Sequence, residues 1–217
     1  EEKKVVIRDL QNQNTYTETY DKLILAPGAS PILPAGIGGI HRSHVHVIRN
    51  VEDIERLRAA IDRRDCTDIA VIGGGFIGVE TAENLSLAGK HVTLVEGSDQ
   101  IMTPFDHDIV QILHKELDDH GVDVLLDSML TAVEEKHIVV TQRKEQHRLK
   151  ADAVVMAIGV APQTKLAKEA GLKIGETGGI WVNHNYQTSD PDIYAVGDAI
   201  EGYHALLHKP ARLALAG

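Results

Sequence analysis

The feature that most constrains the fold of this chain is the glycine-rich run Gly-Gly-Gly-Phe-Ile-Gly at residues 73–78. A short apolar segment rich in β-branched residues precedes it at 68–72, and apolar residues at helical spacing follow it up to Ala88. This order predicts a strand, a tight turn and a helix. A second apolar strand at 91–95 then ends on Glu96, which completes a βαβ unit with an acid at its end.

Each part of this run has its own physical reason. Gly73 allows a sharp turn, Gly75 lets backbone N–H groups approach a phosphate without an intervening Cβ, and Gly78 lets the helix lie close to the strand. The helix N-terminus adds free N–H groups and the positive end of its dipole. Glu96 stands where a carboxylate accepts hydrogen bonds from an adenosine ribose. Because context supports the motif, we predict a dinucleotide site formed by Gly73, Gly74, Gly75, Phe76, Ile77, Gly78 and Glu96.

Composition narrows the class of protein. The 217 residues include 32 acidic and 22 basic side chains, a net charge of −10 that argues against nucleic acid or an anionic membrane surface as a partner. The longest apolar stretches are far shorter than the roughly 20 residues of a bilayer span. The single cysteine excludes an internal disulfide and fits a reducing, cytoplasmic compartment. The first residue is not Met and the last residues fall inside an apolar run, so we expect a piece of a longer protein.

The rest of the chain predicts an α/β protein. Turn residues between two alternating segments indicate a hairpin, continuous apolar runs indicate strands buried on both faces, and periods of 3.6 indicate helices. Residues 31–40, rich in Pro and Gly, are the best linker candidate. The expected elements are a hairpin at 3–9 and 15–20, a buried strand at 21–26, helices at 51–63 (capped by Asn50), 108–120 and 162–170, strands at 122–126, 153–159 and 192–198, and an antiparallel meander at 129–134, 137–141 and 147–150.

Several words of the sequence occur in an order typical of one family. They are Tyr-Asp-x-Leu-Ile-Leu-Ala-Pro-Gly-Ala-x-Pro at 20–31, the glycine run with Val79 and Glu80, Asp-Gln-Ile-Met-Thr-Pro at 99–104, Ala-Ile-Gly-Val-x-Pro at 157–162, and Thr-Ser-Asp-Pro-Asp-Ile-Tyr-Ala-Val-Gly-Asp at 188–198. The chain resembles the FAD-dependent pyridine nucleotide–disulfide oxidoreductases over nearly its whole length. The resemblance is strongest to the branch of coenzyme A disulfide reductases, NADH oxidases and peroxidases, and persulfide reductases.

The resemblance implies a Rossmann-type NAD domain, a parallel sheet plus an antiparallel meander, inserted between two segments of an incomplete FAD domain. The expected bounds are 1–32 for the first flavin segment, 33–160 for the NAD(P)-binding domain and 161–217 for the second flavin segment. The family's glycine motif for FAD and its redox cysteine would precede residue 1, and its dimerisation domain would follow Gly217. The intact enzyme is therefore expected to be a homodimer.

The resemblance also implies roles for particular residues. Phe76 matches the aromatic residue that gates the nicotinamide pocket, and Glu80 matches the acid beside flavin and nicotinamide; both are our catalytic candidates. Gly28, Gly159 and Asp198 fall in cofactor-binding words, with Asp198 expected on the ribityl hydroxyls of FAD. Without the family, Phe76 would be a core aromatic residue, Glu80 a solvated helix acid and Asp198 a turn residue.

Two tempting sites are better explained without function. Cys66 lies outside every family word and has no second cysteine, so we expect a small apolar filler rather than a nucleophile. His41, His44 and His46 lack a nearby Cys, Asp or Glu to complete a metal shell, so we expect a solvated loop and no metal site.

The function that follows is the NAD(H)-binding part of a flavin-dependent NAD(P)H:disulfide-type oxidoreductase. In the intact enzyme a hydride would pass from NADH to FAD and then to a cysteine-centred acceptor such as coenzyme A disulfide, persulfide, peroxide or oxygen, a choice that these residues leave open. Glu96 predicts a preference for NADH, since it would repel a 2′-phosphate. The chain alone is expected to bind NAD(H) but to be inactive. The alternative is a non-catalytic NAD-binding sensor module.

Overall fold

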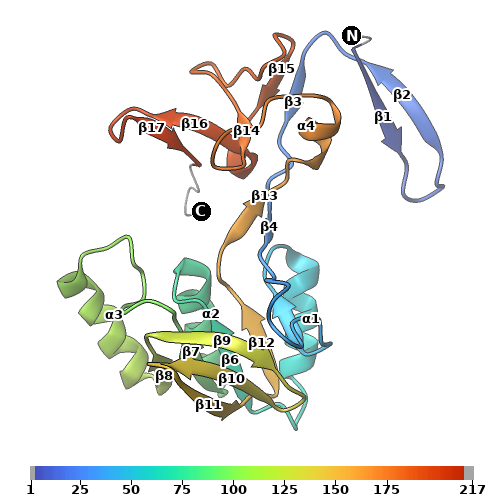
Figure 1. Ribbon diagram of the computed structural model, residues 1–217. Coiled ribbons are helices and arrows are strands. Elements are labelled where there is room, and N and C mark those ends of the chain that lie inside the picture. The colour runs from blue at the N-terminus through green and yellow to red at the C-terminus, as the bar shows by residue number, and fades with distance from the viewer. Residues whose placement is uncertain (1–2, 213–217) are drawn as a thin grey trace. The chain divides into compact units, whose positions relative to one another are not determined.

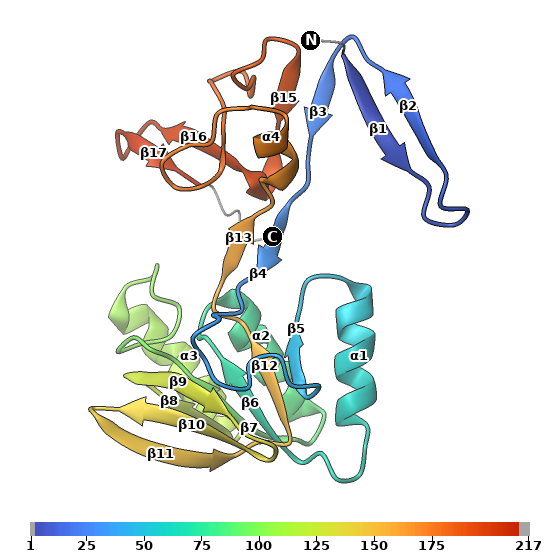
Figure 2. The ribbon, with the colours of Figure 1, turned by 45° about the vertical axis from the view of Figure 1, so that its right-hand side comes forward.

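The computed structural model describes residues 3–212 (Figure 1). The chain forms two compact units, one from Glu1–Ser30 with Ala161–Gly217 and the other from Pro31–Val160. We call them the split unit and the inserted unit. Strands β4 (Ala29–Pro31) and β13 (Val160–Pro162) carry the chain out and back, and they pair with each other in a two-stranded sheet (Figure 2).

The inserted unit is built on a five-stranded parallel sheet with the order β5-β12-β6-β7-β8. Its strands are β5 (Val45–Val47), β12 (Ala153–Met156), β6 (Asp68–Ile72), β7 (His91–Val95) and β8 (Val122–Leu125). The chain runs outward from β6 through β7 to β8, whereas β12 and β5 lie on the other side of β6. The connections therefore change direction between β6 and β12. This parallel sheet confirms the predicted α/β class.

Helices cover one face of this sheet: α1 (Val51–Ile61), α2 (Phe76–Leu87) and α3 (His107–Asp119). Asn50 caps α1 as predicted, since its side chain accepts a hydrogen bond from the Asp53 N–H at 2.9 Å. The helices pack on alternate residues of the strands, such as Ile69 and Val71 of β6. All three helices lie within about two residues of their predicted bounds. Within residues 3–212 no helix is long and apolar enough to cross a membrane.

An antiparallel meander covers the opposite face of the sheet. It consists of β9 (Ser128–Val133), β10 (His137–Gln142) and β11 (Glu145–Lys150), in the order β11-β10-β9. The intervening strand residues, such as Ala70 and Ile72, point to this side and join a second core with Leu130 and Ile138. Because both faces are covered, the strands read as continuous apolar runs.

The split unit contains shorter elements around a third core. A hairpin of β1 (Lys4–Arg8) and β2 (Thr15–Thr19) appears as predicted, and β3 (Leu23–Leu25) pairs in parallel with β15 (Ile193–Ala195). A 3-10 turn, Gly197–Ala199, begins one residue after β15. The unit also holds α4 (Lys165–Glu169), β14 (Ile180–Trp181), β16 (Ile200–His204) and β17 (Lys209–Ala211). Its core includes Leu25, Ala167, Ile180 and Ile193.

Several sequence predictions were wrong in detail. The 31–40 segment is not a free linker, because Ile40 is 3% exposed and Ile37 packs against the meander-side core. The strand at 21–26 is not buried on both faces, since Ile24 is 66% exposed and β3 has a single partner in its two-stranded sheet. Pro162 does not begin a helix: it ends β13, and α4 begins only at Lys165.

Candidate functional site

The glycine run lies at the carboxyl end of β6, next to the carboxyl end of β12. Gly73 follows β6 directly, and the Ala157 N–H next to it donates to the Ile72 carbonyl at 2.7 Å. The direction of the connections changes between these two strands. Ligands of open α/β sheets bind outside the carboxyl ends of strands at such a switch point. The topology therefore brings Gly73–Gly78 and Gly159 to the edge where a ligand is expected.

Three glycines of the run are required by the fold itself. Gly73 has a φ of +107°, and a Cβ there would lie 2.4 Å from the Ala157 carbonyl oxygen. A Cβ on Gly78 would lie 1.8 Å from the Gly73 oxygen, which shows how closely α2 approaches the turn. A Cβ on Gly74 would meet the Ile101 side chain at 2.7 Å. Any larger residue at these positions forces the backbone or a buried side chain to move.

Gly75 differs from these three. Its φ is −79°, which any residue adopts, and apart from its chain neighbours no atom lies within 4 Å of a Cβ built on it. It is the N-cap of α2, yet no side chain caps the helix there and the first turn holds no acid. The N–H groups of that turn have no intrahelical acceptors, and the helix dipole makes them attractive to an anion. No steric contact inside the inserted unit requires a glycine here, whereas a phosphate close to the backbone does.

The Glu96 carboxylate is held in place beside the turn. One oxygen accepts from the Gly74 N–H at 2.6 Å and the other from the Ser98 N–H at 2.8 Å. Glu96 is partly exposed, and each carboxylate oxygen can accept more than one hydrogen bond. The arrangement leaves acceptor capacity for a ribose hydroxyl at a fixed position next to the glycine turn.

The other sequence candidates of the inserted unit lie around this edge. Phe76 and Ile77 begin α2 and are 42% and 41% exposed. Gly159 follows β12 with a φ of +108°, a backbone conformation that favours glycine. Glu80 is exposed in the next turn of α2 and, with Ile77, lines a groove of about 600 Å³ between α1 and α2.

Gly28 and Asp198 belong to the split unit and are described within it. They follow the carboxyl ends of the paired strands β3 and β15, so the parallel pairing places both at the same edge. Gly28 has a φ of +69°, and its carbonyl accepts from the Gln163 N–H at 2.9 Å. Asp198 is exposed in the 3-10 turn after β15. A cavity of about 520 Å³ elsewhere in this unit is lined by Trp181, Tyr203 and their neighbours.

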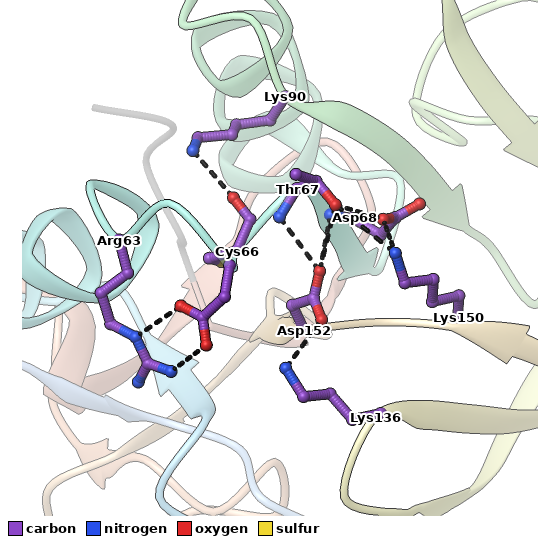
Figure 3. A network of polar contacts seen from close by, with 9 residues as sticks. Arg63, Cys66, Thr67, Asp68, Lys90, Lys136, Lys150 and Asp152 are labelled. Carbon is purple, nitrogen blue, oxygen red and sulfur yellow. Dashed lines mark hydrogen bonds and ion pairs between the residues drawn. The ribbon is translucent and has the colours of Figure 1, made fainter.

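Cys66 lies at the opposite end of the sheet, before β6. Its side chain is buried, burial raises the pKa of its thiol, and its carbonyl accepts from the Lys90 ammonium at 2.8 Å (Figure 3). A buried thiol with a raised pKa is a poor nucleophile, in keeping with the expected apolar filler. Next to it Asp152 joins β12 to β6: one carboxylate oxygen accepts from the N–H groups of Thr67 at 3.0 Å and Asp68 at 3.1 Å, and the other contacts Lys136.

The histidine segment is a solvated loop only at His41, which is exposed in a turn. His46 lies in β5, His44 immediately precedes it, and both are half-buried because β5 is packed into the sheet and the meander-side core. Burial lowers the pKa of both imidazoles. Within residues 3–212, no three His, Cys, Asp or Glu side chains are placed to hold a metal ion.

The sequence alone assigns no role to residues 101–102, which pack against one side of the glycine turn. Met102 donates its N–H to the Gly74 carbonyl at 2.7 Å, and Ile101 is fully buried against Gly74. The sequence does contain a signal, because residues 99–104 are one of the segments that carry the family resemblance. Its contact with Gly74 depends on folding and could not be deduced from spacing.

Comparisons with known proteins identify the family. Residues 1–213 match the family described as pyridine nucleotide-disulphide oxidoreductase. A CoA-dependent NAD(P)H sulfur oxidoreductase of Pyrococcus abyssi is 32% identical over 213 residues, which are 98% of this chain and 47% of that protein. This chain thus spans about half the length of the curated relatives that it matches.

Solved structures show the same fold. The reduced CoADR-RHD of Bacillus anthracis has a TM-score of 0.92 and 41% identity, and the match covers 99% of this chain and 38% of that one. The water-forming NADH oxidase of Lactobacillus brevis, solved with NADH bound, has a TM-score of 0.85 and 31% identity, covering 99% and 47% of the two chains. The sequence word matches, the switch-point glycine turn and these comparisons together place the chain in the pyridine nucleotide-disulphide oxidoreductase family.

Proposed function

We propose that the inserted unit binds NAD(H) at the carboxyl edge of β6 and β12, as the nicotinamide-binding part of a flavin-dependent oxidoreductase. The observation that carries the proposal is Gly75. No steric contact in the inserted unit requires a glycine there, but a dinucleotide pyrophosphate on the α2 N-terminus does.

The residues of the inserted unit fit the parts of the dinucleotide. The N–H groups of the first turn of α2 would hold the pyrophosphate, and Glu96 would accept from the adenosine ribose while Gly74 and Ser98 keep its carboxylate oriented. Phe76 stands at the helix start as the proposed gate of the nicotinamide pocket, and Gly159 lets the β12 edge come close to the cofactor. We place Glu80 beside the nicotinamide in the intact enzyme.

When bound to the intact enzyme, NADH would supply a hydride and FAD would accept it. In the split unit, Gly28 and Asp198 lie at the carboxyl edge of β3 and β15 and would form part of the FAD site, with the Asp198 carboxylate accepting from ribityl hydroxyls. No second G-x-G-x-x-G occurs in residues 1–30 or 161–217. We therefore expect the 217-residue chain to bind NADH without retaining FAD.

For the whole enzyme we propose a small disulfide-type or oxygen-type acceptor, because relatives are named for sulfur and CoA-dependent substrates and for oxygen reduction to water. We also propose a cytoplasmic homodimer. Family membership favours an oxidoreductase over the alternative of a sensor module. A sensor module would not need the flavin-domain motifs at 20–31 and 188–198.

Calorimetric titration of the 217-residue chain with NADH tests the central claim. We expect one binding site per chain, competed by NAD⁺. The preparation should be colourless and should not oxidise NADH in the presence of a disulfide. Absence of NADH binding by a chain with a normal thermal transition would refute the assignment of the glycine turn.

A further inference from the structure

The loop from Gln100 to His107 has no role in the proposed function, yet it is fixed to the glycine turn. Ile101 has no exposed surface, and its Cγ2 atom lies 2.7 Å from the place of a Cβ on Gly74. The next residue donates its N–H to the Gly74 carbonyl. The position of this loop is therefore coupled to the turn that would hold the pyrophosphate.

Hydrogen bonds within the loop hold the backbone of Phe105. Its N–H donates to the Met102 carbonyl at 3.0 Å, and its own carbonyl accepts from Gln100 Nε2 at 2.9 Å. Gln100 Oε1 in turn lies 3.0 Å from His107 Nδ1, at the start of α3. With its N–H and its carbonyl both engaged, the residue presents its ring from a defined place beside the turn.

The ring of Phe105 meets the ring of Phe76 edge to face. The centroids are 5.9 Å apart and the planes are inclined by 72°, an arrangement that the ring quadrupoles favour. Both rings remain more than two-fifths exposed, so the pair is a surface contact and not part of a core. Phe105 belongs to the 100–107 loop, so a Phe76 ring in contact with it lies beside that loop.

We propose that Phe105 is a positioning residue for NADH binding, which holds the ring of Phe76 beside the 100–107 loop and so keeps the opening at Gly75 accessible. The inference rests on the proposed function, since it requires a dinucleotide at this turn. Without its partner, the Phe76 ring samples its other rotamers, some of which cover the turn. The apparent affinity for NADH is then reduced in proportion to the fraction of chains in which the site stays open.

The first experiment is calorimetric titration of the 217-residue chain and its Phe105→Ala variant with NADH. The dissociation constant should rise by about 2- to 10-fold, the factor that corresponds to one edge-to-face contact. Phe105→Tyr keeps the ring and should bind like the unmodified chain. Ile112→Ala, on the exposed side of α3, removes a comparable apolar side chain and should change nothing. If the alanine variant unfolds, Phe105→Leu, which lacks the ring but keeps apolar bulk, should show the same loss.

A double-mutant cycle separates this role from a structural one. In a Phe76→Ala background, Phe105→Ala should have no further effect on NADH affinity, because the ring that it positions is gone. Equal losses in both backgrounds, or no loss in either, would overturn the inference while the proposed function stands. If the unmodified chain fails to bind NADH, the proposed function itself has failed, and this inference with it.

Discussion

The two edges of the parallel sheet in the inserted unit are built from opposite kinds of residue. Where β6 and β12 begin, charged side chains satisfy one another and the backbone: Asp152 accepts from two N–H groups and contacts Lys136, while Asp68 pairs with Lys150 at 2.6 Å. Where the same strands end, the chain offers glycines with positive φ and a helix start without a side-chain cap.

This difference means that the starting edge of the two strands serves the stability of the fold, whereas the ending edge serves ligand binding. At the starting edge, Asp152 and Asp68 have their partners inside the protein, so a mutation there lowers the stability of the fold. At the ending edge, N–H groups remain available for a ligand, and Gly75 in particular has no partner that a side chain would displace. Mutations at the starting edge should therefore lower the free energy of unfolding, whereas mutations at the ending edge should lower the affinity for NADH.

The largest effect is expected for Gly75→Val. Branched Cβ substituents would occupy the place of pyrophosphate oxygens, so NADH affinity should fall on the order of 100-fold, or about 2.7 kcal/mol. The free energy of unfolding should change by no more than about 1 kcal/mol, the difference between glycine and valine at an N-cap. Calorimetric titration and thermal unfolding measure the two quantities.

Gly36→Val is a matched control for this change. Gly36 also has open space around a built Cβ and no positive φ, but it lies outside the glycine run. It should leave NADH affinity unaltered. An unchanged affinity in Gly75→Val would mean that the turn has no contact with phosphate.

The second effect, at the starting edge, is expected for Asp152→Ala. Its side chain is only 4% exposed, and its removal leaves the N–H groups of Thr67 and Asp68 without their acceptor. We expect a loss of about 2 kcal/mol in the free energy of unfolding, with NADH affinity unchanged. Denaturant unfolding checks the first and titration the second.

Asp65→Ala provides the comparison, because its ion pair with Arg63 is exposed and should contribute less than about 1 kcal/mol. If Asp152→Ala weakened NADH binding without lowering the free energy of unfolding, the assignment of stability to one edge and binding to the other would be wrong.

A third, smaller effect concerns coenzyme choice. The Glu96 carboxylate would accept from a ribose 2′-OH and repel a 2′-phosphate, and residues 97–108 contain no Lys or Arg to attract one. Glu96→Ala should narrow the preference for NADH over NADPH by about tenfold, or 1.4 kcal/mol. Paired titrations with the two coenzymes measure the ratio, with Glu83→Ala on the exposed side of α2 as control. Equal affinities in the unmodified chain would contradict the role of Glu96.

The smallest effect is a dependence of stability on acid. Burial alone would raise the pKa of the Asp152 carboxyl, but the N–H groups of Asp68 and Thr67 and the Lys136 ammonium outweigh it and hold that pKa well below its usual range. A depressed pKa in the folded state stabilises the protein above the unfolded pKa of about 3.9, and the contribution is lost as the pH falls below it. The stability difference between the unmodified chain and Asp152→Asn should therefore be largest near neutral pH and should shrink below about pH 4. A constant difference down to pH 2 would contradict this account.

Much of the inserted unit could be predicted from sequence because local and global signals agree there. The run Ile69–Ile72 is apolar and the structure buries it on both faces of the sheet. The helices that follow begin and end near Gly75, Gly89 and Gly121. The glycine motif, with Glu96 at the end of the next strand, predicts the candidate dinucleotide site from the sequence alone.

The failures occurred where a residue's environment depends on distant chain. Nothing local in His44 or His46 indicates that β5 joins the sheet beside β12, and nothing in Ile24 indicates that β3 has a single partner. Pro162 suits a helix start, but pairing of β13 with β4 takes precedence. The contact of Phe105 with Phe76 joins residues 29 positions apart and has no signature in the pattern.

The pairing of β4 with β13 has a consequence for how such a protein can be assembled. The Ile32 N–H donates to the Gly159 carbonyl at 3.0 Å, so the entry and exit of the inserted unit are already joined. Closing a long loop has an entropic cost that rises with the length of the loop. In the inserted unit, folding of the unit itself brings its two ends together, so this cost is offset by the contacts within the unit. The two ends of the inserted unit are thus neighbouring strands, so joining the unit to another pair of neighbouring strands would add little further entropic cost of loop closure.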